Sequence, residues 1–143
     1  MTASALFDSY LWTQGTSKTI SLTGLVANQT YTIAALSQDI NPPAFRAATF
    51  TANGVSASTV NNSVFEAPFT LGVNYVLINT RSDATGKIDL VYSKNSAVNS
   101  VEAGINGFQL TETPEPGSIL LGISGLLGLA GMRKFRRSPA ATA

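Results

Sequence analysis

Two carboxylates, Asp83 and Asp89, are the side chains in this 143-residue chain whose spacing first suggests chemistry. They flank a predicted turn, so they could meet across a hairpin and bind Ca²⁺, which prefers carboxylate oxygens. The dense spacing of Asp and Asn that a calcium loop needs is absent, however. We therefore favour the alternative that Asp83 caps the turn and Asp89 is exposed on a strand, and we predict no metal site.

The chain lacks the residue types and motifs on which nucleophilic and acid–base catalysis most often depend. It contains no histidine and no cysteine, which removes the commonest general base and any thiolate. No Gly-x-Ser-x-Gly motif is present, and Glu66 and Glu102 have no recognisable partner in the sequence. The sequence thus predicts a protein that is not an enzyme and that uses no cofactor.

Aromatic side chains offer a different chemistry, because an exposed ring beside amide groups can bind a sugar. Trp12, Tyr75 and Tyr92 are the candidate sugar contacts. Tyr10 is a further aromatic of this kind, and the candidate polar partners are Asn53, Asn62 and Asn106. An aromatic on a strand is more often a core residue, and this remains the alternative for each of them.

The charge distribution excludes one large class of partner. Only 12% of the residues are charged, and the net charge is +1. Residues 1–112 carry five basic and seven acidic side chains, whereas four of the nine basic residues fall within residues 133–137. The body of the chain therefore has no basic patch, and we expect no nucleic-acid partner.

The elements that must position these side chains are strands. The body is rich in Thr, Ser, Asn, Ala and Val, which favour strands and polar turns. Asn53-Gly54 is a strong two-residue hairpin signal. The expected strands cover residues 19–22, 29–36, 44–52, 55–60, 65–70, 75–80, 88–92 and 104–110. Short strands at this spacing predict an antiparallel sandwich or barrel.

Parts of the body are similar to known extracellular modules. Residues 22–25 (Leu-Thr-Gly-Leu) and 29–33 (Gln-Thr-Tyr-Thr-Ile) resemble the passage of a fibronectin type III domain in which a Tyr hydroxyl caps a turn. Residues 48–54, 83–90 and 103–110 resemble jelly-roll, galactose-binding-like ectodomains. The resemblance implies an all-β, antiparallel, jelly-roll-like β-sandwich over residues 1–112. We expect a single apolar helix after it, from the composition of the residues that follow.

The composition changes in residues 113–143. Pro114, Glu115 and Pro116 form a stiff extended spacer, because neither proline has an N–H to donate. Residues 117–132 then run without a charge, and as a helix they would cover about 24 Å of a hydrocarbon core about 30 Å thick. A basic cluster follows at Arg133, Lys134, Arg136 and Arg137. We prefer a membrane span, whose basic end stays in the cytoplasm, to a buried core helix.

This order of Pro-Glu-Pro, short apolar span and basic cluster resembles the PEP-CTERM sorting signal of Gram-negative bacteria. The resemblance implies an exosortase as partner, which would cut near the Pro-Glu-Pro motif. It also implies an inner-membrane intermediate with its body in the periplasm, and then delivery to the cell surface or the extracellular polysaccharide matrix. Such a substrate needs an N-terminal export signal, and residues 1–15 do not have the features of one. We therefore expect the sequence to be an N-terminally truncated fragment or to begin at a misassigned start.

Three functions remain open on these residues. The first is a structural or adhesive protein of the envelope or exopolysaccharide. The second is a carbohydrate-binding module for extracellular polysaccharide. The third is the remnant of a secreted enzyme with an upstream catalytic part. We expect the first.

Overall fold

The computed structural model describes residues 10–38, 46–60 and 69–113. The chain divides into two units, residues 1–113 and residues 114–143. The predicted sorting motif, span and basic cluster therefore lie outside the described residues. Within those residues the only helix is one short 3₁₀ turn, η1 (Ser96–Val98), and the other regular elements are strands, which confirms the expected all-β class.

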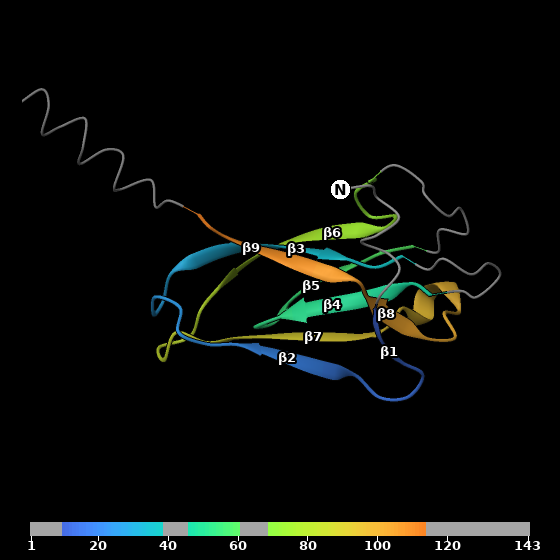
Figure 1. Cartoon of the computed structure of the whole chain (residues 1–143), viewed down its shortest axis with the longest axis horizontal. Coiled ribbons are helices and arrows are strands. Elements are labelled where there is room, and N and C mark those ends of the chain that lie inside the picture. Colours follow the sequence, from blue (N-terminus) through green and yellow to red (C-terminus); the bar gives the residue numbers. More distant parts are fainter. Residues whose placement is uncertain (1–9, 39–45, 61–68, 114–143) are drawn as a thin grey trace, which may run out of the picture. The chain divides into compact units, whose positions relative to one another are not determined.

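The described residues contain nine strands in three sheets, and every pairing between these strands is antiparallel (Figure 1). One sheet has four strands in the order β2-β7-β4-β5, another has three in the order β6-β3-β9, and β1 pairs with β8. Their bounds are β1 (Leu11–Thr13), β2 (Lys18–Leu22), β3 (Thr30–Leu36), β4 (Ala48–Ala52), β5 (Val55–Ser58), β6 (Tyr75–Arg81), β7 (Ile88–Lys94), β8 (Ala103–Ile105) and β9 (Gly107–Glu112).

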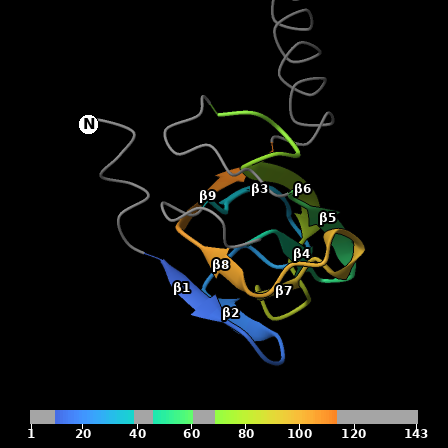
Figure 2. The same cartoon turned by 90° about the vertical axis from the view of Figure 1, so that its right-hand side faces the viewer.

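The core lies between the four-stranded and three-stranded sheets, which form two layers in Figures 1 and 2. Alternate residues of each central strand are buried, as the period of two in a strand requires. Ile33 and Ile78 of one sheet pack in the same cluster as Phe50 and Leu90 of the other. Each of these four side chains is almost fully buried, so the two layers are held together mainly by apolar contact.

Asn106 interrupts what would otherwise be one long strand. On one side of it β8 pairs with β1, and on the other side β9 pairs with β3. Its backbone N–H donates to the Leu36 carbonyl at 2.9 Å, and its side-chain oxygen accepts from the Gln38 N–H at 2.7 Å. Because β1 covers only β8, the second edge of β9 has no strand partner among the described residues.

Two local expectations are confirmed. Asn53 and Gly54 join β4 to β5 with φ angles of 43° and 89°, which is the left-handed pair of a tight hairpin. The hydroxyl of Tyr31 accepts from the Val26 N–H at 3.1 Å, so it caps the preceding turn.

Two others are not. Residues 69 and 70 were expected to end a strand, but they precede the turn before β6 because Asn74 closes that turn with a side-chain bond to the Thr70 N–H. The strand β1 was not expected at all. Among residues 10–38, 46–60 and 69–113, no helix has the length and hydropathy that a membrane crossing requires.

Candidate functional site

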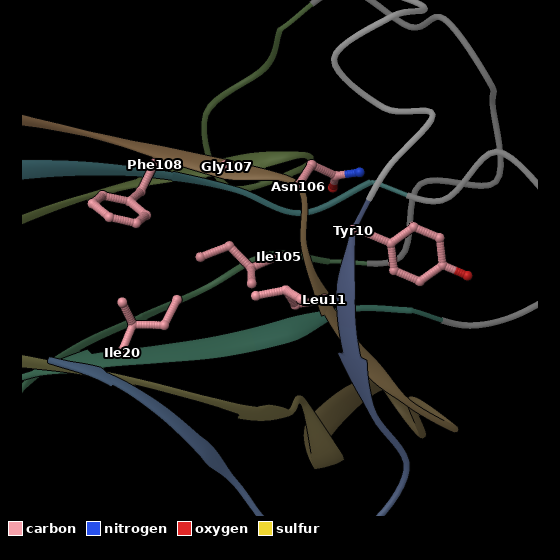
Figure 3. Close-up of a pocket in the computed structure, with 7 residues that line it drawn as sticks. All are labelled: Tyr10, Leu11, Ile20, Ile105, Asn106, Gly107 and Phe108. Atoms are coloured by element: carbon pink, nitrogen blue, oxygen red, sulfur yellow. The ribbon is translucent and has the colours of Figure 1, made fainter.

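An apolar hollow of about 250 Å³ opens where β1, β2 and the β8–β9 junction meet. Figure 3 shows the side chains of Leu11, Ile20, Ile105 and Phe108 turned toward a common space, whereas the ring of Tyr10 points away from it. Leu11 lies opposite Ile105 in the β1–β8 pair. Because directly opposed residues share a face, this register turns both side chains to the same side.

The hollow is open because it lies beside the edge strands β2 and β9, which have no second strand partner among the described residues. Phe108 lies opposite the buried Ala35, so its ring is on the inner face of the sheet, yet it remains 38% exposed. Leu11 is 63% exposed although it shares a face with the buried Ile105. The edges of β2 and β9 therefore leave apolar surface uncovered by any other described residue.

A second, larger hollow of about 490 Å³ adjoins the first and shares Tyr10, Leu11 and Ile20 with it. Trp12, Lys18 and Tyr92 are its other large side chains. Lys18 of β2 lies directly opposite Tyr92 of β7, so both side chains are on one face of the sheet.

The three side chains differ in exposure. Trp12 is 52% exposed, whereas Tyr92 is only 3% exposed and belongs to the core. Burial raises the pKa of the Tyr92 hydroxyl, which is therefore neutral near pH 7. The hollow thus combines an exposed indole, a neutral phenol and an ammonium group.

A paired charge cluster anchors Tyr10 on another side of β1. Arg46 forms an ion pair with Glu102, lies 5.1 Å from the centroid of the Tyr10 ring and donates to the Tyr10 hydroxyl. The amide of Gln14 donates to the second Glu102 oxygen at 3.4 Å. Glu102, which had no recognisable partner in the sequence, is thus neutralised by Arg46.

The structure brings together two of the three predicted sugar contacts, Trp12 and Tyr92, at the larger hollow. Tyr75 is on β6, and its neighbours Val76 and Ile78 are in the core, so its side chain lies on the outer face of the other sheet. There it meets Phe69 edge-on at 6.4 Å between ring centroids.

The predicted polar partners are scattered. Asn106 lines the smaller hollow, and Asn62 and Glu66 lie outside the described residues. Asn53 is used in the fold, because its side chain donates to the carbonyls of Arg81 and Lys87 and accepts from the Asp89 N–H.

The two aspartates also serve the fold. One oxygen of Asp83 accepts from the Thr85 N–H, the Thr85 hydroxyl and the Lys87 N–H at 2.7–2.9 Å, so Asp83 caps its turn. Asp89 accepts from the Ser21 hydroxyl at 2.6 Å and pairs with Lys87 at 2.8 Å. The hydroxyl of Thr85 lowers the pKa of Asp83, and the ammonium of Lys87 lowers that of Asp89.

Neither aspartate belongs to a larger ligand set. In the part of the chain that the structure describes, no three residues of the types His, Cys, Asp and Glu come close enough to hold a metal ion.

The arrangement suits binding more than proton transfer, since neither hollow is lined by a described carboxylate. Reasoning from the sequence missed Lys18, Leu11 and Phe108, and only the alternation in residues 19–22 pointed toward this edge of the sheet. No protein-family model, curated protein or solved structure matches the chain significantly. The functional argument therefore depends on the residues themselves.

Proposed function

We propose that this is an exported, non-catalytic protein that a PEP-CTERM signal sorts to the cell surface or to the exopolysaccharide matrix, where its β-sandwich has a structural or adhesive role. The observation that carries the proposal is the order of three sequence elements. Pro114-Glu115-Pro116 comes first, the uncharged residues 117–132 follow, and the basic cluster at residues 133–137 comes last.

Each element has a physical role in this proposal. Residues 117–132 partition into the bilayer because they carry no charge. The basic cluster stays on the cytoplasmic side, which leaves residues 1–113 in the periplasm. The proline-flanked Glu115 then lies at the outer surface of the membrane, where an exosortase could reach an extended backbone. Cleavage there would release the body from its temporary anchor.

Two variants of the full chain test the sorting signal in an exosortase-bearing host. Either Glu115→Ala or deletion of residues 133–137 should leave an uncleaved, membrane-associated product in a fractionation followed by immunoblotting. Glu112→Ala, which changes a carboxylate just outside the motif, is the matched control and should be processed normally. Surface delivery of both test variants at the level of the control would overturn the proposal.

For the body we propose a jelly roll. The order β2-β7-β4-β5 is that of one of its two sheets. If β8 and β9 are counted as one strand interrupted at Asn106, the remaining order β1-β8/β9-β3-β6 is that of the other. An experimental structure in which β1 left this position would contradict the assignment.

A second candidate function, a carbohydrate-binding module, is favoured by one specific observation. Trp12 is half exposed at a hollow that also contains Tyr92 and Lys18, and this is the chemistry with which proteins hold sugar rings. A glycan array with the purified full chain distinguishes the two candidates. Submillimolar binding to a defined saccharide would favour the module, and its absence would favour the structural role.

A further inference from the structure

We infer that the hollow lined by Trp12, Lys18 and Tyr92 binds a carboxylate-bearing saccharide, such as a uronic-acid unit of an acidic polysaccharide. The inference rests on the carbohydrate-binding candidate above and names the ligand class for that site. The volume of the hollow, about 490 Å³, is within the range of small-molecule sites.

Trp12 supplies the surface for the sugar ring. Its side chain is 52% exposed on a strand of only three residues, and it lies opposite Gly104, which has no side chain to cover it. An indole left in water in this way presents a large apolar face beside an N–H donor. A sugar ring, with C–H groups on its faces and hydroxyls at its rim, complements both.

The local charge selects the sign of the ligand. Lys18 lies opposite Tyr92, and Lys94 is two residues beyond Tyr92 on the same strand, so the three side chains share one face of the sheet. Neither lysine has an ion-pair partner in the structure of the described residues. Lys87, in contrast, is paired with Asp89 at 2.8 Å.

No described carboxylate offsets these two ammonium groups. Glu102 is engaged by Arg46, and the residues that line the hollow include neither Asp nor Glu. Lys18, which lines the hollow, is therefore an uncompensated positive charge beside a partly apolar wall. Such a charge attracts an anion, and the low-dielectric wall strengthens that attraction. A neutral sugar would leave the ammonium charge of Lys18 uncompensated, whereas a uronate carboxylate would neutralise it.

Tyr92 contributes a directional contact. Its hydroxyl makes no hydrogen bond within the described chain and is neutral near pH 7, so it can donate to a ligand oxygen. Its ring is packed in the hydrophobic core. The site therefore combines a donor that is packed in the core with the flexible ammonium group of Lys18.

The test measures calorimetric binding of oligogalacturonate and of a neutral glucan of equal length to the full chain in a mild detergent. Only the acidic oligomer should bind, and added salt should weaken it. Trp12→Ala should reduce affinity about tenfold or more, and Lys18→Gln about fivefold, in line with the loss of one central aromatic or charged contact. Far-ultraviolet circular dichroism would establish that each variant is folded.

Two variants serve as matched controls. Tyr75→Ala removes an aromatic from the outer face of the other sheet, and Lys87→Gln removes a lysine that is already paired; neither should change affinity. Equal binding of acidic and neutral oligomers, lost in Trp12→Ala, would overturn the inference but leave the carbohydrate-binding candidate intact. No binding of either oligomer would overturn both. If Lys87→Gln lost as much affinity for the acidic oligomer as Lys18→Gln, the binding would be unspecific charge attraction. That result would also overturn the inference.

Discussion

Gly86 lies directly against the backbone of Leu25. The Leu25 N–H donates to the Gly86 carbonyl at 3.0 Å, and a Cβ added to Gly86 would overlap the Leu25 carbonyl oxygen. Gly86 also has a φ angle of +73°, which disfavours any side chain. Gly86→Ala should therefore lower the free energy of unfolding by about 2–5 kcal/mol, the sum of a left-handed backbone penalty and an overpacking penalty.

A substitution at Gly24 measures the left-handed backbone penalty without the overpacking penalty. Its φ angle is +79°, but a Cβ added there would meet no atom within 4 Å. Gly24→Ala should therefore cost only the backbone penalty, about 1–2 kcal/mol. Urea unfolding of both variants measures the difference, and equal losses would mean that the contact with Leu25 does not constrain Gly86.

The hydroxyl of Tyr31 closes a local turn of the body. It accepts from the Val26 N–H at 3.1 Å, and its ring is buried in the core. Tyr31→Phe keeps the ring and leaves that N–H without its acceptor, so we expect a loss of about 1 kcal/mol in unfolding free energy. Tyr75→Phe, in which the hydroxyl makes no bond within the described residues, should change stability by less than about 0.5 kcal/mol. A loss in Tyr75→Phe as large as that in Tyr31→Phe would contradict the role of the bond.

The features that could be predicted from the sequence are those set by neighbouring residues. Asn53-Gly54 specifies its hairpin because few residue pairs tolerate two positive φ angles. The alternation in β3 predicts which of its side chains are buried. In both cases the information lies within a few positions of the chain.

The features that could not be predicted depend on pairing across long separations. Lys18 meets Tyr92 only because β2 pairs with β7, and nothing near Lys18 specifies that register. The Arg46–Glu102 pair likewise joins residues 56 positions apart. β1 is three residues long and was missed because its partner β8, and not its own pattern, makes it a strand.

The carboxylate of Asp83 should make the protein sensitive to acid. Hydrogen bonds from Thr85 and Lys87 hold its pKa below the ordinary value of 3.8. A group with a lowered folded-state pKa contributes stability above the unfolded value and loses it as the pH falls through the folded value. Stability should therefore fall between about pH 5 and pH 2. Asp83→Asn can still accept the backbone bonds but has no charge, so its unfolding curves should depend less on pH across that range. A pH dependence identical to that of the unchanged protein would contradict this assignment.

The ion pair between Arg46 and Glu102 should be the most costly single charge to remove. The exposed fractions of the two side chains are 17% and 6%, so removal of one partner leaves the other with little water. Breaking a buried pair in this way costs about 3–5 kcal/mol, and we expect that loss for Glu102→Gln. Glu112→Gln, on an exposed position of β9, should change stability by less than about 0.5 kcal/mol.

A double-mutant cycle separates the pair from the packing around it. Arg46→Met removes the other charge but keeps an apolar stem beside Tyr10, whose ring centroid lies 5.1 Å from the guanidinium carbon. Arg46→Met leaves the Glu102 carboxylate, which is only 6% exposed, without its ion-pair partner, whereas the double variant has no such carboxylate. The double variant should therefore lose less stability than the two single losses added together. The coupling should exceed about 1 kcal/mol in urea unfolding. Strict additivity would mean that Glu102 is held by Gln14 and the surrounding backbone, and that Arg46 stabilises the protein only through its contact with Tyr10.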